Sequence, residues 1–122
     1  MKPARDTLFI IAAPFEDAAL DGTWFCTSCA TMEGALLANP DWANRIEVKR
    51  SAHPRPRQEI INLIGEENQS MPVLVLADGA TPPADAKEFE GCYFIDEPKP
   101  ITRYLAAAYG AVRFLNAKTD EE

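Results

Sequence analysis

The sequence predicts a single α/β domain whose elements follow the order β-α-β-α-β-β-α. Short apolar runs of strand length alternate with longer segments whose apolar residues recur at helical spacing. The 122 residues match the usual size of one domain, about 100–150 residues. A hydrophobic fraction of 47% with 25% charged residues is ordinary for a folded domain. We expect a mixed four-stranded sheet flanked by helices, because helices on both faces bury the apolar sides of the strands.

The first third of the chain predicts one strand and one helix. An apolar run over 7–12 has the length and boundaries of a buried strand. Residues 14–24 are rich in acidic residues and alanine, and we expect a loop there. Apolar residues at helical spacing then predict a helix over 28–39, which Pro40 ends. The pair 41–42 adds one further helical turn.

The middle of the chain predicts a second strand and a second helix. Residues 46–49 alternate apolar and charged side chains, as in a half-buried strand. This strand should run parallel to the first, because a helix connects the two by a right-handed crossover. Prolines at alternate positions make 51–56 an extended loop. The helix after it carries three isoleucines on one face and ends at Gly65.

The last third predicts two antiparallel strands and a final helix. Residues 73–76 are apolar at every position, as expected of a central strand that is covered on both faces. Residues 92–95 form its hairpin partner, after a long excursion over 80–91 that contains two prolines. A helical pattern then runs from about Lys99 to Tyr109, and Gly110 can cap it.

Residues 1–122 should form one domain with its core at about 7–110. We expect 111–115 to extend the last helix before a short charged tail. Pro14 and Glu16 interrupt the first apolar run too early for a signal peptide. No apolar run approaches the roughly 18–20 residues of a membrane span. These observations predict a cytoplasmic protein with no membrane partner.

The charge of the chain argues against binding to nucleic acid. Twelve basic side chains oppose nineteen acidic ones, which gives a net charge of −7. Binding to phosphates needs a basic face. We therefore expect no nucleic-acid partner.

Three cysteines provide the strongest chemical signal. An odd number of cysteines in a cytosolic chain does not indicate a disulfide framework. Cys26 and Cys29 form a Cys-x-x-Cys pair, which indicates a redox dithiol or half of a metal site. His53 and Cys92 could supply the two further ligands of a zinc site. Cys92, however, is predicted to start its strand at the end of the sheet away from the dithiol. Zinc binding is thus a weaker alternative, and we expect no resident metal or cofactor.

The element order, the Cys-x-x-Cys pair at the start of the first helix, and Pro72 directly before the third strand resemble the thioredoxin-like superfamily. The resemblance covers about residues 7–110. It implies that the Met71–Pro72 peptide bond is cis and that the proline faces the dithiol. It also implies that backbone groups of Met71 are free to pair with a bound peptide or with glutathione.

The second half is more similar to glutaredoxins and to the N-terminal domain of glutathione transferases. In those proteins a Glu-Ser-x-Ala-Ile-x-x-Tyr-Leu segment opens the last helix and holds the γ-glutamyl end of glutathione. Glu97, Ile101, Tyr104 and Leu105 match that pattern, whereas Pro98 replaces the serine and lacks its hydroxyl and N–H. Glutathione is therefore a possible co-substrate with Glu97 as a contact. Taken whole, the chain most resembles a small bacterial thioredoxin-like family of unassigned function.

The predicted activity is thiol–disulfide exchange. Cys26 lies at the expected N-terminus of a helix, where the helix dipole and free N–H groups favour a thiolate. Cys29, one turn later, is the resolving thiol that attacks a mixed disulfide on Cys26. The partner would be a protein or small-molecule disulfide or thiol.

Several neighbours could modulate this dithiol. Arg55 and Arg57 should approach it from the loop after the second strand, where they could bind a carboxylate or favour a thiolate. His53 lies in the same loop. The carboxylates that precede Cys26 would act in the opposite direction, and Trp24 with Phe25 could form an apolar rim for a partner. A non-catalytic module of the same fold, which binds a thiol peptide or a protein without turnover, is the main alternative.

Overall fold

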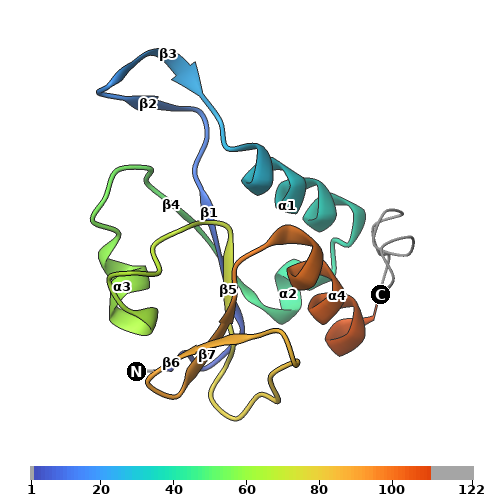
Figure 1. Cartoon of the computed structure of the whole chain (residues 1–122). Coiled ribbons are helices and arrows are strands. Elements are labelled where there is room, and N and C mark those ends of the chain that lie inside the picture. Colours follow the sequence, from blue (N-terminus) through green and yellow to red (C-terminus); the bar gives the residue numbers. More distant parts are fainter. Residues whose placement is uncertain (1, 111–122) are drawn as a thin grey trace.

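The computed structural model describes residues 2–110 as a mixed α/β fold (Figure 1). Its five-stranded sheet has the order β4-β1-β5-β7-β6, and a separate two-stranded sheet pairs β2 with β3. The strands are β1 (Thr7–Ile11), β2 (Phe15–Asp17), β3 (Leu20–Trp24), β4 (Glu47–Ser51), β5 (Val73–Val75), β6 (Lys87–Phe89) and β7 (Cys92–Ile95). The helices are α1 (Thr27–Ala38), α2 (Trp42–Arg45), α3 (Gln58–Ile64) and α4 (Pro98–Tyr109).

The sheet confirms two predictions about strand direction: β1 and β4 are parallel, and β5 and β7 are antiparallel. β1 runs parallel to β4, to which α1 and α2 connect it, and antiparallel to β5. β5 and β7 are antiparallel neighbours. The four helices correspond to the predicted ones, and α2 is the further turn expected after Pro40.

The expected number of sheet strands was wrong by one. β6 lies within the predicted excursion and pairs with β7 at the edge of the sheet. This strand has three residues, of which Lys87 and Glu88 are exposed. An edge strand needs only one neighbour and can present charges to solvent. It therefore lacks the apolar pattern by which a strand is recognised.

The prediction of a loop over 14–24 was also wrong, because β2 and β3 form a hairpin there. The hairpin projects beyond the end of β1, away from the helices that cover the sheet (Figure 1). All five residues of β3 are exposed, so no alternation between buried and exposed side chains marks it in the sequence. Gly22 adopts φ +100°, a backbone conformation that favours glycine.

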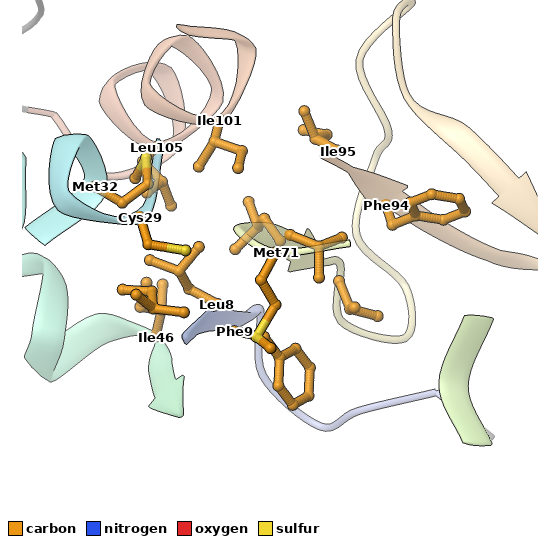
Figure 2. Packing of buried hydrophobic residues seen from close by; sticks show 14 of the residues in the cluster. Leu8, Phe9, Cys29, Met32, Ile46, Met71, Phe94, Ile95, Ile101 and Leu105 are labelled. Atoms are coloured by element: carbon orange, nitrogen blue, oxygen red, sulfur yellow. The ribbon is translucent and has the colours of Figure 1, made fainter. Parts of the chain in front are cut away.

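Helices cover both faces of the sheet, as expected. α1, α2 and α4 lie on one face and α3 on the other (Figure 1). All five residues of β1 are buried, and their side chains alternate between the two faces. In Figure 2, Leu8 lies toward Cys29, whereas Phe9 lies beside Met71. The core therefore extends on both sides of β1.

A buried carboxylate joins α4 to the start of β1. Asp6 accepts hydrogen bonds from the hydroxyls of Tyr104 at 3.0 Å and Tyr109 at 2.7 Å, and from the backbone N–H of Ala77 at 2.7 Å. Burial raises the pKa of Tyr109 to about 12, and the Asp6 carboxylate adds to the effect. The network fixes the C-terminal half of α4 against the sheet.

No helix within residues 2–110 is long and apolar enough to cross a membrane. The predicted extension over 111–115 and the charged tail lie outside the described residues. The single-domain and cytoplasmic assignments stay predictions.

Candidate dithiol site

Cys26 occupies the N-cap position of α1. Its backbone is extended, at φ −88° and ψ 122°, and its Sγ accepts a hydrogen bond from the N–H of Cys29 at 3.2 Å. A sulfur thus takes the role that a serine or aspartate oxygen plays at other helix starts. The side chain is half-buried. This position gives the sulfur a backbone donor and the positive end of a twelve-residue helix.

Cys29 points into the core, where its side chain is only 2% exposed (Figure 2). Its Sγ accepts a hydrogen bond from the N–H of Ile11 at 3.3 Å, at the end of β1. Burial raises the pKa of this thiol to about 12, and the nearby Cys26 adds to the rise. The Ile11 N–H and the charge of Arg57 lower the pKa of Cys29 and so partly offset this rise. The two thiols are therefore unequal: both are free, but Cys29 is deeper.

The pairing of β1 with β5 brings the predicted proline to this end of the sheet. Phe9 pairs with Val73 in an antiparallel register. Continued by two residues, that register sets Met71 beside Ile11, the residue whose N–H contacts Cys29. The Met71–Pro72 bond is cis, as the resemblance implied.

Arg57 is buried at the start of α3. Its guanidinium donates to the carbonyl oxygen of His53 and, at 2.8 Å, to that of Gln69. Burial lowers the pKa of Arg57, and the charge of the exposed Arg55 adds to this effect, whereas both dithiol cysteines oppose it. Of the two predicted cations, Arg57 thus acts electrostatically on the dithiol, and Arg55 lies on the surface.

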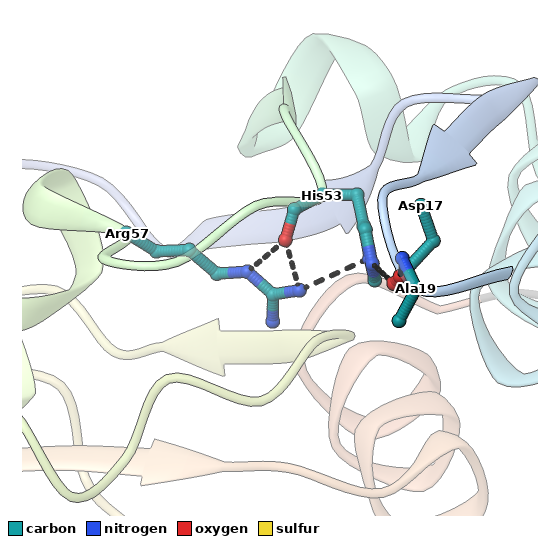
Figure 3. A network of polar contacts seen from close by, with 4 residues as sticks. All are labelled: Asp17, Ala19, His53 and Arg57. Carbon is teal, nitrogen blue, oxygen red and sulfur yellow. Dashed lines mark hydrogen bonds and ion pairs between the residues drawn. The ribbon is translucent and has the colours of Figure 1, made fainter.

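His53 joins this loop to the hairpin. Its Nε2 lies 2.8 Å from Oδ2 of Asp17, and its ring stacks on Phe15 with 4.2 Å between the ring centroids. Figure 3 shows the chain of contacts from Arg57 through His53 to Asp17. An Arg57 nitrogen lies 3.4 Å from Nδ1, an arrangement that fits an imidazole donating from Nε2. We call the contacts of His53 with Asp17 and Phe15 the clasp. It was not predicted from the sequence, because 36 residues separate His53 from Asp17.

The residues before Cys26 present an apolar surface. Leu20 is 56% exposed, Trp24 42% and Phe25 62%. Trp24 and Phe25 agree with the apolar rim expected from the sequence. Leu20, near the turn of the hairpin, is a further exposed apolar side chain.

Glu97 also lies at the dithiol end of the sheet. β7 ends at Ile95, which pairs with Leu74 in β5, and Glu97 is then the N-cap residue of α4. Its backbone carbonyl accepts the N–H of Ile101 at 3.0 Å, while its side chain is exposed and makes no capping hydrogen bond. The segments that carry Cys26, Pro72 and Glu97 therefore lie at the same end of the main sheet.

Cys92 begins β7 at the opposite end of the sheet and is buried. Burial raises the pKa of its thiol. Within residues 2–110, no three His, Cys, Asp or Glu side chains gather as a metal site would require. The zinc alternative therefore has no support from the part of the chain that the structure describes.

Comparisons with known proteins identify the family. No curated protein and no solved structure matches the chain. A family model described as "Protein of unknown function (DUF3088)" matches residues 5–113, which include the hairpin, the dithiol, Pro72 and α4. The chain therefore belongs to the DUF3088 family.

Proposed function

We propose that this protein is a thiol–disulfide oxidoreductase with a thioredoxin-like fold. The observation that carries the proposal is the capping hydrogen bond, in which Sγ of Cys26 accepts the N–H of Cys29 at 3.2 Å. A thiolate gains from that donor and from the helix dipole. The strand order β4-β1-β5-β7, in which only β1 and β4 are parallel, also agrees with such a fold.

The reaction begins at Cys26. Its thiolate attacks one sulfur of a substrate disulfide, forms a mixed disulfide, and releases the other substrate sulfur as a thiolate that takes up a proton. Cys29 then attacks Sγ of Cys26 and releases the second substrate thiol. Its proton passes to that departing sulfur. The substrate gains two electrons, and the dithiol becomes an intramolecular disulfide.

The inequality of the two thiols suits these roles. The raised pKa of Cys29 keeps it protonated while Cys26 meets the substrate. Cys29 follows Cys26 by three residues, one helical turn, so it is held for the second step.

A thiol reductant must return the disulfide to the dithiol. We propose glutathione or a dithiol for this role, with Met71 and Pro72 offering backbone groups. Glu97 and the buried Arg57 flank the same end of the sheet, and Arg55, two residues before Arg57, is exposed. These five residues are the proposed ligand contacts.

The test measures reduction of insulin disulfides by the full chain with dithiothreitol as reductant. We expect turnover above the rate of dithiothreitol alone, its loss in Cys26→Ser, and a trapped mixed disulfide in Cys29→Ser. Cys92→Ser is the matched control, because that thiol lies at the far end of the sheet. A wild-type rate equal to that of dithiothreitol would overturn the proposal.

The second candidate is a non-catalytic binding module. The deep burial of Cys29 favours it, because a resolving thiol must reach its partner sulfur. Binding of a thiol peptide without turnover, together with slow alkylation of Cys26, would support this candidate.

A further inference from the structure

We propose that the β2–β3 hairpin is a docking arm for an extended, basic, cysteine-containing segment of a partner protein. The segment would pair with the free edge of β3 and lead its disulfide to Cys26. This inference rests on the proposed oxidoreductase function and names its substrate class. The substrate would then be a polypeptide rather than a small disulfide.

The hairpin offers an unpaired strand edge. β2 and β3 form a sheet of only two strands, and no third strand in residues 2–110 joins them. All five residues of β3 are exposed. An extended peptide can add to such an edge through backbone hydrogen bonds, and alternate side chains then give specificity. Leu20, Trp24 and Phe25 provide exposed apolar contacts along the way.

The direction of β3 leads the partner to the dithiol. β3 ends at Trp24, two residues before Cys26. Since a strand rises about 3.3 Å per residue, roughly 7 Å separate the last paired position from the nucleophile. A partner cysteine two or three residues beyond the paired segment would therefore reach Cys26.

The arm is held in place before the partner arrives. His53 contacts Asp17 at 2.8 Å and stacks on Phe15, so both ends of β2 are fastened to the loop that carries Arg57 (Figure 3). A strand edge that is already ordered costs less entropy to pair.

The charge of the arm selects the partner. Residues 13–25 contain Glu16, Asp17 and Asp21 and no lysine or arginine. Glu16 and Asp21 are exposed, whereas Asp17 is engaged by His53. The whole chain, with these three residues included, has a net charge of −7. Basic residues in the partner segment would complement this surface, and an acidic peptide would be repelled.

The experiment measures kcat/KM of the reduced protein for several disulfide substrates. Two peptides of equal length are used. Each carries one cysteine in a disulfide bond and the same apolar residues, but one peptide is basic and the other is acidic. We expect kcat/KM to be about tenfold higher for the basic peptide, with the difference shrinking at high salt. Oxidised glutathione should react more slowly than the basic peptide. In Glu16→Lys/Asp21→Lys the preference between the two peptides should reverse.

Backbone pairing is tested with N-methylated versions of the basic peptide. Methylation at alternate residues of one register should abolish the rate gain, while methylation in the other register should leave it, because only one set of N–H groups faces β3. Equal rates for all disulfides, or a preference for oxidised glutathione, would overturn the docking arm and leave the oxidoreductase proposal intact. Equal effects of both methylation registers would overturn strand pairing. If no disulfide is reduced, the oxidoreductase proposal itself fails.

Discussion

His53 holds Asp17 across 36 residues of sequence, with Nε2 2.8 Å from Oδ2. This contact joins the hairpin that leads to Cys26 with the loop that carries Arg57. Two segments that flank the dithiol are thereby fixed to each other. The geometry of the site depends on this clasp as well as on α1.

The clasp should be visible in the titration of Asp17. The hydrogen bond from His53, followed by that from the N–H of Ala19, holds the pKa of Asp17 below its ordinary value of 3.8. A lowered pKa in the folded state stabilises the fold at higher pH, and this contribution is lost as the pH falls through that pKa. We expect a midpoint below 3.8 by NMR of the side-chain carboxyl, and a rise toward 3.8 in His53→Ala. An unchanged midpoint in the variant would contradict the clasp.

The three thiols should differ sharply in reactivity. With a pKa of about 12, Cys29 has a thiolate fraction of about 10⁻⁴ at pH 8. Brief treatment of the reduced native protein with iodoacetamide should label Cys26 and spare Cys29 and the buried Cys92. Peptide mass spectrometry reads the sites, and the same treatment in denaturant should label all three. Labelling of Cys29 as fast as Cys26 would contradict the assigned roles.

Arg57 should support the reactivity of the dithiol. Arg57→Gln removes a buried charge that acts on both cysteines, so we expect Cys26 to alkylate about threefold to tenfold more slowly at pH 7. Arg55→Gln is the matched control, because that side chain is exposed, and its rate should stay within about twofold. Circular dichroism checks that Arg57→Gln is folded. Equal rates in the two variants would remove Arg57 from the site.

The carboxylate of Asp6 should stabilise the fold far from the dithiol. Asp6→Ala leaves the hydroxyls of Tyr104 and Tyr109 and the N–H of Ala77 without their acceptor. We expect the free energy of unfolding in urea at pH 7 to fall by about 2–4 kcal/mol. Tyr109→Phe removes one of these hydrogen bonds and should cost about 1–2 kcal/mol. A loss in Asp6→Ala no larger than in Tyr109→Phe would show that the network is not shared.

Two glycines should respond in opposite directions to alanine. Gly65 has φ +90°, and a Cβ there would lie 2.6 Å from the ring of Phe89. Gly65→Ala should destabilise the protein by about 1–3 kcal/mol, through backbone strain and the clash. Gly34 lies within α1 with open space around it, so Gly34→Ala should stabilise by about 0.5–1 kcal/mol. Thermal unfolding of both variants checks the two signs.

The sequence was informative where burial leaves a periodic pattern. The strands around Leu8 and Leu74 and the helix around Ile101 are almost fully apolar on their buried faces, so the existence and type of each element could be predicted. The same is true of Cys26 at a helix start. By contrast, β3 and Lys87–Phe89 are exposed, and an exposed strand carries no hydrophobic alternation.

Long-range polar contacts could not be predicted for another reason. The contact of His53 with Asp17 depends on where a hairpin projects, and that of Asp6 with Tyr109 spans 103 residues. Side-chain partners at such separations follow from the tertiary fold rather than from local preference. Arg57 was placed near the dithiol by topology alone, but its burial required the loop geometry.

The outer strands of the main sheet have a consequence for self-association. On β4, Lys49 and Arg50 form ion pairs with Glu59 and Glu33, and Lys87 on β6 pairs with Asp96. A second molecule that paired with either edge strand would have to remove water from these charges. Growth of the five-stranded sheet by strand pairing between molecules is thereby opposed at both of its edges.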